Sequence, residues 1–171
     1  MQTLLKIRLA QFGLSVADKK THHTDMGARK DGGTHDRRRM AFLGFTIYRS
    51  KNRNQTAAKT VFQTDGKRFS RAKASMREKI RRIKHWPVVE QVKAINAILR
   101  GHFNYYGLAG NARRLQRFSD FTCEEWRHSL SKRSQKGRLN WERFAALLEQ
   151  HPLVTPKLKI NYSQMAAYAR L

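Results

Sequence analysis

The densest group of chemistry-bearing side chains in this sequence is a run of cations. Residues 67–84 contain nine Lys and Arg side chains and a single acid, Glu78. The nine are Lys67, Arg68, Arg71, Lys73, Arg77, Lys79, Arg81, Arg82 and Lys84. A solvated helix face usually mixes both signs through Glu–Lys pairs. The near-absence of acids therefore favours phosphate binding over plain solvation.

Four of these cations repeat at helical spacing beside an apolar row. The basic row is Lys73, Arg77, Arg81 and Lys84. The apolar row is Ala72, Met76, Ile80 and Ile83. One residue corresponds to about 100° around a helix, so the basic row should lie next to the buried row. A helix of about eighteen residues is roughly 27 Å long, which is enough to follow several phosphates.

Two further basic clusters follow along the chain. The first is Arg113, Arg114 and Arg117, at the start of a predicted helix. A helix N-terminus presents free N–H groups and positive potential, so these arginines would reinforce an anion site. The second is Lys132, Arg133, Lys136 and Arg138, in a polar link. Such a loop fits a wrapped nucleic-acid backbone and a plain soluble linker equally well.

The segment RGHFNYYG at 100–107 mixes a cation with groups that contact bases. Tyr and His rings stack on unpaired bases, and Asn can read a base edge. Phe103 and Tyr106 continue an apolar stripe, so we expect them in the core. His102 and Tyr105 lie off that stripe and, with Arg100, are the contact candidates.

No pattern for catalysis or metal binding is found in the sequence. Two-metal nucleotidyl transfer needs neighbouring carboxylates, and the sequence has no Asp-Asp pair. The group His22, His23, Asp25, His35 and Asp36 does not have the spacing of a zinc or nuclease site. Cys123 is expected as a small core residue. We predict no catalytic residue, no metal and no cofactor.

Composition sets the class of partner. The chain has 171 residues with 36 Lys+Arg against 12 Asp+Glu, a net charge of +24. Such an excess calls for a polyanion, with nucleic acid the first candidate and an anionic membrane surface the second. No run approaches the length of a membrane span, and the N-terminus does not read as a secretory signal. A single cysteine fits a reducing compartment.

The elements before residue 66 are predicted as follows. Residues 2–12 form a short helix ended by Gly13, Leu14–Val16 form a stub of strand, and 18–39 form a long exposed loop. AFLGFTIY at 41–48 and KTVFQTD at 59–65 form two strands of a hairpin closed by Gly66.

The remainder has helical periodicity. The first helix runs from Phe69 to about Trp86, the second has its stripe from Val88 to Tyr106, and the third follows Gly110-Asn111 as far as Leu130. A short fourth helix covers 141–148 and is ended by Pro152. We therefore predict a mainly α fold: a three-helix bundle plus a short fourth helix, preceded by a β-hairpin and an N-terminal helix and loop.

Several strings resemble group II intron reverse transcriptase/maturases. LRGHFNYYG at 99–107 is the most diagnostic, and KRSQKGRLNWERF at 132–144 is similar to a string of bacterial members. RLAQFGLSVADKKT at 8–21 and FLGFT at 42–46 resemble the end of the polymerase palm, and HPLVTPKLKI at 151–160 resembles the tail. The stretch from Lys67 to Arg133 is similar to the maturase-specific domain, also called the thumb or domain X.

The resemblance implies three domains: a palm remnant at 1–65, a maturase-specific helical domain at 66–150 and a tail at 151–171. The family's Tyr-Ala-Asp-Asp motif does not occur in this sequence, so we expect a piece without polymerase activity of its own. The resemblance also implies that the thumb helices hold intron RNA or an RNA–DNA duplex, in the bacterial cytoplasm. The contacts it favours are Arg71, Lys73, Arg77, Arg81, Arg100, His102, Arg113, Arg114 and Arg117.

The first functional hypothesis is a non-catalytic, maturase-type RNA-binding module that assists splicing. The alternative is a subunit of a split reverse transcriptase that needs a separate fingers–palm chain. A basic DNA-binding or membrane-surface protein is a weaker reading. In the family, residues 1–65 pack on the rest of the palm, so we expect Phe42, Phe45, Ile47 and Val61 to be exposed in this chain alone.

Overall fold

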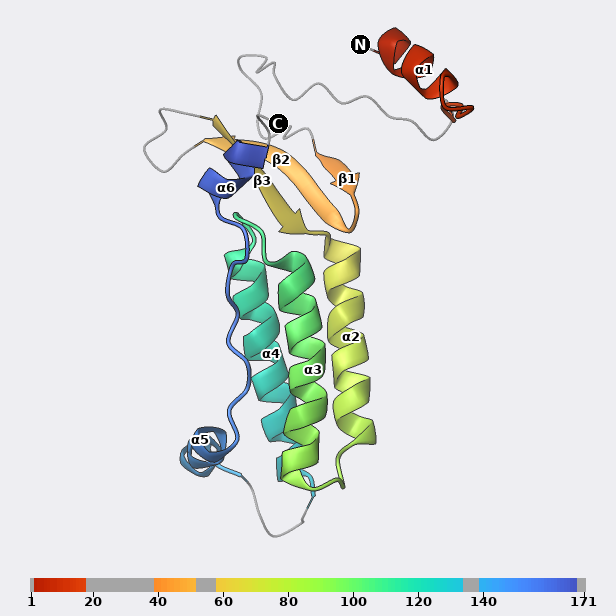
Figure 1. Cartoon of the computed structure of the whole chain (residues 1–171). Helices are drawn as coiled ribbons and strands as arrows, with labels where there is room; N and C mark the ends of the chain where they lie inside the picture. Colours follow the sequence, from red (N-terminus) through yellow and green to blue (C-terminus); the bar gives the residue numbers. More distant parts are fainter. Residues whose placement is uncertain (1, 18–38, 52–57, 134–138, 169–171) are drawn as a thin grey trace. The chain divides into compact units, whose positions relative to one another are not determined.

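The computed structural model describes residues 2–17, 39–51, 58–133 and 139–168 (Figure 1). The chain divides into two units, Met1–Arg39 and Met40–Leu171. Most of the loop predicted at 18–39 lies outside the described residues, and so does the group of His and Asp side chains at 22–36. The predicted division into three domains stays a prediction.

The first unit contains helix α1 (Gln2–Ala10). Its end confirms Gly13 as the helix stop, with φ +68°. The N–H of Gly13 bonds to the carbonyl of Ala10, and the N–H of Leu14 bonds to that of Leu9. The strand predicted at 14–16 is wrong, because this helix cap already uses the Leu14 N–H that a strand would need.

The second unit begins with a three-stranded antiparallel sheet in the order β1-β2-β3. Its strands are β1 (Met40–Phe42), β2 (Phe45–Lys51) and β3 (Ala58–Thr64). The predicted hairpin is confirmed as β2–β3, paired from Phe45↔Thr64 to Lys51↔Ala58. The prediction of one strand over 41–48 is wrong, because Leu43 and Gly44 form a tight turn with φ +46° and +79°.

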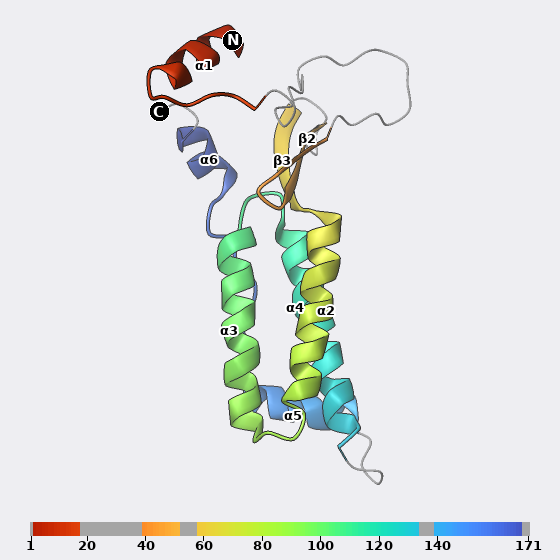
Figure 2. The ribbon, with the colours of Figure 1, turned by 90° about the vertical axis from the view of Figure 1, so that its right-hand side faces the viewer.

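Three long helices follow: α2 (Gly66–Arg82), α3 (Val88–Tyr106) and α4 (Ala112–Ser131). They run side by side in both ribbon views (Figures 1 and 2). Their facing stripes form one buried core: Phe69, Met76, Ile80, Ile83, Val92, Ile95, Leu99, Phe103, Leu115, Phe118, Trp126 and Phe144. The predicted mainly α fold with a three-helix bundle is confirmed.

Helix α2 starts three residues earlier than its apolar stripe indicates. The carboxylate of Asp65 accepts hydrogen bonds from the N–H groups of Lys67 (3.0 Å) and Arg68 (3.1 Å). These bonds, that from Arg68 first, lower the pKa of Asp65. Asp65 is therefore the N-cap that fixes where the basic helix begins.

Helix α5 (Trp141–Gln150) lies across the far end of the bundle (Figure 2). The side chain of Asn140 accepts a bond from the Arg143 N–H and caps this helix. Phe144 is fully buried, with its ring centroid 5.5 Å from that of Trp126. The short fourth helix predicted from the sequence is thus present, and its one buried ring attaches it to the bundle.

The segment 151–160, which we call the return segment, runs back along the bundle in an extended conformation (Figure 1). Asn96 of α3 holds its start by donating to the carbonyl of Pro152 (3.0 Å) and accepting from the N–H of Val154 (2.8 Å). A bridge between Leu108 and Ile160 holds its end. A further helix that the sequence did not predict, α6 (Tyr162–Tyr168), follows.

A buried amide joins the sheet to the bundle. Asn111 accepts from the Thr64 N–H at 2.9 Å and donates to the Thr64 hydroxyl and the Tyr106 carbonyl, each at 2.8 Å. Phe45 packs against the rings of Tyr105 and Tyr106 at 5.9 and 5.2 Å.

The sheet is better covered than the sequence predicted. We expected Phe42, Phe45, Ile47 and Val61 to be exposed; Phe45, Ile47 and Val61 are buried, and Phe42 alone of the four is exposed. The end of α3 supplies part of the cover, because the rings of Tyr105 and Tyr106 lie on Phe45. None of the described helices is long and apolar enough to cross a membrane.

Candidate nucleic-acid interface

The basic row of α2 lies along the junction with α4. The Lys73 ammonium lies 5.3 Å from the ring centres of both Phe69 and Phe121, and the Arg77 guanidinium lies 5.2 Å from that of Phe121. We call this surface the α2–α4 face. It comprises Lys73, Arg77 and Arg81 of α2 and Lys84 of the turn after it, with Arg114, Glu125, His128 and Lys132 of α4 and its C-cap.

One ion pair crosses this face. Arg77 donates to the Glu125 carboxylate at 2.6 Å. This hydrogen bond raises the pKa of Arg77 and lowers that of Glu125, and the charges of Arg77, His128 and Arg81 lower the latter further. The guanidinium is half-exposed, so the pair adds little stability. Its effect is to hold Arg77 in one orientation on the Phe121 ring.

The lower part of the α2–α4 face, toward the C-terminal ends of both helices, is hollowed into a recess of about 280 Å³. Its walls are Arg77, Ile80, Arg81, Lys84, Glu125, His128, Ser129 and Lys132. Cations therefore approach this hollow from both helices, and Glu125 is the one acid among the residues that line it.

The structure separates the three arginines at the start of α4. Arg114 faces α2, with its guanidinium 4.9 Å from the ring centre of Phe69. Arg113 borders a different hollow of about 360 Å³, which Pro156 and Leu158 of the return segment help to line. Arg117 is exposed. Only Arg114 joins the basic row of α2.

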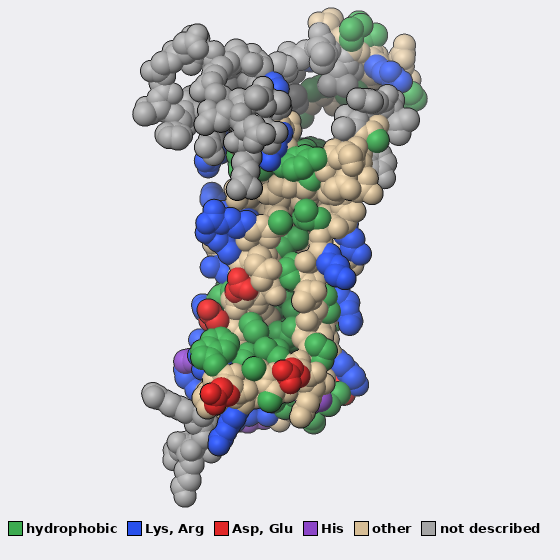
Figure 3. Space-filling model, turned by 90° about the vertical axis from the view of Figure 1, so that its left-hand side faces the viewer, with side chains coloured by type: hydrophobic (Ala, Val, Ile, Leu, Met, Phe, Trp, Pro, Cys, Tyr) green, Lys and Arg blue, Asp and Glu red, His purple; other side chains and the backbone are tan. Residues whose placement is uncertain are grey.

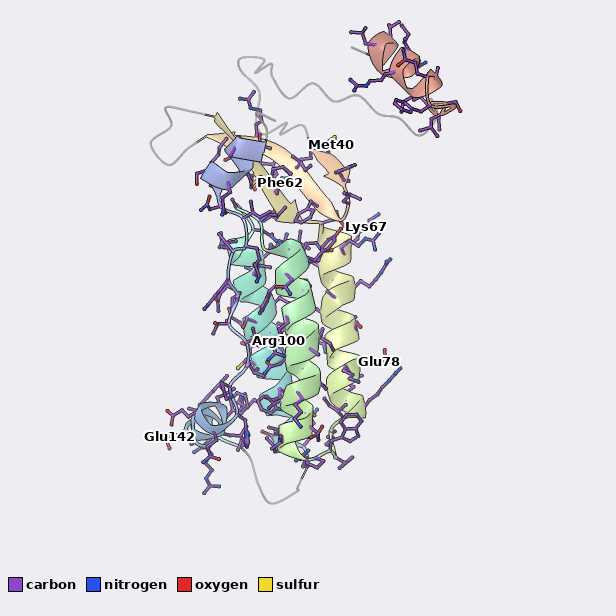
Figure 4. All side chains as sticks on the ribbon, viewed as in Figure 1. Met40, Phe62, Lys67, Glu78, Arg100 and Glu142 are labelled. Carbon is purple, nitrogen blue, oxygen red and sulfur yellow. The ribbon has the colours of Figure 1, made fainter. Side chains whose placement is uncertain are left out.

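The residues at 100–107 likewise divide. Phe103 is buried, as predicted, and Arg100 is exposed on α3 (Figure 4). Tyr105 is 54% exposed, but its hydroxyl donates to the carbonyl of Leu43 at 2.8 Å. Tyr105 therefore supports the β1–β2 turn while leaving part of its ring open.

His102 does not stand on the surface where the sequence placed it. Its ring stacks on Phe118 at 4.1 Å and lies 4.7 Å from Tyr106. Its Nε2 atom has no hydrogen-bond partner among the described residues. Burial lowers the pKa of His102 to about 4. The prediction for His102 was wrong because the buried face of α3 is wider than the stripe formed by its most apolar residues.

The link after α4 also differs from expectation. Arg133 donates from Nε to the carbonyl of Lys84 and from Nη2 to that of Trp86 at 2.5 Å. It therefore binds carbonyls at the C-terminal end of α2, where a cation is favoured. Lys136 and Arg138 lie outside the described residues.

Acidic and basic side chains are unevenly spread over the bundle. On the side shown in Figure 3, Lys and Arg line both margins, and the acids lie mostly between them. Lys67 and Glu78 project from the side of α2 away from α3 (Figure 4). Arg71 is four residues from Lys67 and seven from Glu78, so it shares their side and is separate from the basic row.

Sequence reasoning missed three residues of the recess: Glu125, His128 and Ser129. The spacing of Glu125, His128 and Lys132 by three and four residues places them on one side of α4. That signal was in the sequence, but it becomes informative only when α2 is known to pack on that side. Among the described residues, no three His, Cys, Asp or Glu side chains are grouped as a metal site requires.

Comparison with known proteins gives one match. Residues 69–145 match the family model described as "Group II intron, maturase-specific domain". Searches of curated proteins and of solved structures found no match. The matched span begins at the first buried residue of α2 and ends within α5. It includes the whole α2–α4 face, and it confirms the resemblance of the strings at 99–107 and 132–144. Residues 69–145 of this chain are therefore similar to the group II intron maturase-specific domain.

Proposed function

We propose that this chain binds RNA through the α2–α4 face and helps a group II intron RNA to reach its splicing-competent fold. One observation carries the proposal: within the maturase-specific domain, cations from two helices line one face and share one recess. The chain does no chemistry on the RNA in this proposal, and its lack of a catalytic site stays a prediction.

The dimensions of the face suit a nucleic-acid strand. From Lys73 to Arg81 helix α2 rises about 12 Å, and Lys84 lies in the turn that follows. A nucleic-acid strand carries a charge about every 3.4 Å along its axis, so the helical part of the row spans about three to four phosphates. The charged groups of Lys73 and Arg77 lie over the Phe121 ring, which holds these two cations at the surface between α2 and α4.

Salt dependence of RNA affinity tests this proposal. The test variant replaces four cations of the face with Gln: Lys73, Arg77, Arg81 and Lys84. The matched control replaces four exposed cations outside the face with Gln: Lys67, Lys93, Arg143 and Lys157. Affinity for a structured RNA and for a single strand is measured between about 50 and 300 mM salt. The salt slope is the slope of the logarithm of RNA affinity against the logarithm of salt concentration. We expect the test variant to lower the magnitude of this slope on single strands by about 3, at about 0.7 per lost phosphate contact.

The control should lower the slope by less than about 1, because its cations do not share a face. Equal losses in the two quadruple variants would contradict the proposal, since general charge would then account for the binding. Equal affinity of the wild-type chain for duplex DNA would favour a DNA-binding protein. Binding to anionic vesicles without nucleic-acid preference would favour a membrane-surface protein.

A second candidate function is that of a subunit in a split reverse transcriptase. The observation in its favour is apolar surface on the sheet: Phe42 is 57% and Leu43 is 66% exposed, at the end of edge strand β1. Primer extension by a fingers–palm chain, measured with and without this protein, tests it. Dependence on this protein, lost in Leu43→Asp, would support the candidate. Extension by this protein alone would contradict both functions.

A further inference from the structure

We propose that the recess between α2 and α4 holds a phosphate group of the bound nucleic acid, and that Glu125 orients Arg77 for this contact. The inference rests on the proposed RNA binding and makes it specific. It assigns a defined subsite to the lower part of the α2–α4 face, and it gives the single acid of that subsite a role as a positioning residue.

The donors of the recess converge from two helices. Arg77 and Arg81 come from α2 and Lys84 from the turn after it, and Ser129 and Lys132 come from the end of α4 and its C-cap. A phosphate accepts hydrogen bonds on several oxygens in different directions, so donors on two sides of a hollow suit it better than donors on a flat surface. The recess of about 280 Å³ admits such a group with its attached sugar.

The composition of the walls excludes other ligand classes. Four permanent cations against one carboxylate would repel a metal ion. Ile80 is the only wholly apolar side chain among the lining residues, so an apolar ligand would find little surface to cover. An anion remains, and phosphate is the anion that the proposed RNA partner carries at every nucleotide.

Glu125 would be unfavourable next to a bound anion unless it served another purpose. Its carboxylate accepts from Arg77 at 2.6 Å, while the Phe121 ring supports the guanidinium from below. One N–H edge of Arg77 is thus committed to α4, and the remaining N–H groups are held in place. A guanidinium fixed in this way loses less conformational freedom on binding phosphate than one that is free.

Two substitutions at one position separate orientation from charge. Glu125→Gln and Glu125→Ala remove the same negative charge, but only Gln can still accept a hydrogen bond from Arg77. We expect Glu125→Gln to bind a single-stranded RNA of about 20 nucleotides at least as tightly as wild type. Glu125→Ala should bind about fivefold more weakly than Glu125→Gln, with a salt slope lower by about 0.7. Equal affinities of the two variants would overturn the role of Glu125.

The phosphate site itself is tested by NMR of the ¹⁵N-labelled full chain. Inorganic phosphate is titrated against sodium chloride of equal ionic strength, and the RNA is titrated separately. Shifts of the Arg77 and Arg81 side-chain N–H signals that exceed those of Arg143 in either titration support the site, and a response to RNA alone identifies a backbone phosphate. Uniform shifts of all arginines, or equal shifts with poly-glutamate, would overturn it.

The outcomes also separate this inference from the proposed function. If the quadruple α2 variant flattens the salt slope while the two Glu125 variants and the NMR signals show no site, RNA binding stands and the recess proposal fails. If the quadruple variant matches its control, the proposed function fails with it. Circular dichroism of both Glu125 variants checks that the helical content is unchanged.

Discussion

Two seams between packed segments of this molecule are formed by different kinds of interaction. The α2–α4 face is lined by cations that are exposed or partly exposed, of which Lys73 and Arg77 lie on the Phe121 ring, with one half-exposed ion pair across it. The seam between α3 and the return segment 151–160 is lined by hydrogen bonds to backbone groups. We call it the α3–return seam; it comprises Asn96 and Gly107–Ala109 with residues 152–160.

The difference shows how binding and stability are divided in this fold. Exposed charges contribute little to folding, because water already solvates them. Buried hydrogen bonds contribute more, because an unpaired group left behind cannot reach water. The α2–α4 face is therefore free to bind a polyanion, and the α3–return seam holds the helices that carry it. Substitutions in the α2–α4 face should leave the free energy of unfolding unchanged. Substitutions in the α3–return seam should leave the RNA affinity unchanged.

The largest expected effect is that of Gly107→Ala in the α3–return seam. A Cβ at this position would lie 2.5 Å from the carbonyl oxygen of Phe103 and 3.2 Å from the backbone nitrogen of Lys159. The carbonyl of Gly107 also accepts from the Lys159 N–H at 2.7 Å. Because backbone would have to move, we expect a loss of about 3 kcal/mol in the free energy of unfolding. Urea denaturation measures it.

Gly101→Ala is the matched control on the same helix. A Cβ there would meet nothing within 4 Å, and alanine favours the helix over glycine. We expect a gain of about 0.5–1 kcal/mol. If the two variants were equally stable, the close approach of the return segment to α3 would be wrong. RNA affinity should be the same in both.

A smaller effect is expected from Asn96→Ala. The substitution leaves the Pro152 carbonyl and the Val154 N–H without their buried partner. We expect a loss of about 2 kcal/mol in the free energy of unfolding, with the RNA salt slope unchanged. The exposed Asn104, changed to Ala on the same helix, should cost less than about 0.5 kcal/mol. A reduced slope in Asn96→Ala would show that the two seams are not independent.

Much of this fold could be predicted from periodicity. The apolar stripes of α2, α3 and α4 gave the bundle, because a helix must bury one face and the chain offers three such faces in succession. The stop at Gly13 and the hairpin could also be predicted, since glycine and alternating residues have local meanings.

The predictions that failed depended on neighbours distant in sequence. His102 is a polar residue whose ring lies on Phe118, a residue of another helix, and no local pattern shows that contact. Arg133 lies in a segment with the composition of a soluble linker, but its side chain donates to carbonyls 47 and 49 residues away in the sequence. Likewise the row of α2 could be predicted, but Glu125 could not, because its role depends on which face of α4 lies opposite.

Arg133→Gln sharpens the comparison because this residue was predicted to contact RNA and instead binds carbonyls at the end of α2. Gln91 also donates to the carbonyls of Lys84 and Trp86, at 3.1 and 2.8 Å, so these groups keep a partner in the variant. We expect a loss of about 1 kcal/mol in the free energy of unfolding. The RNA salt slope should fall by less than in Arg81→Gln, and an equal fall would return Arg133 to the interface.

His102 also predicts a pH dependence of stability, which appears only in acid and leaves the stability at pH ~7 unchanged. An unfolded histidine takes up its proton near pH ~6.5, whereas burial lowers the pKa of the folded His102 to about 4. Between these values the unfolded chain binds more protons, so the free energy of unfolding should fall as the pH falls from about 6.5 to 4. Urea denaturation at about pH 7, 6 and 5 of wild type, His102→Leu and the exposed control His85→Gln measures it. The slope should be shallower in His102→Leu and unchanged in His85→Gln. Because His102 lies between α3 and α4, outside the α2–α4 face, its substitution should leave the RNA salt slope as it is; a lower slope would mean that this ring contacts RNA after all.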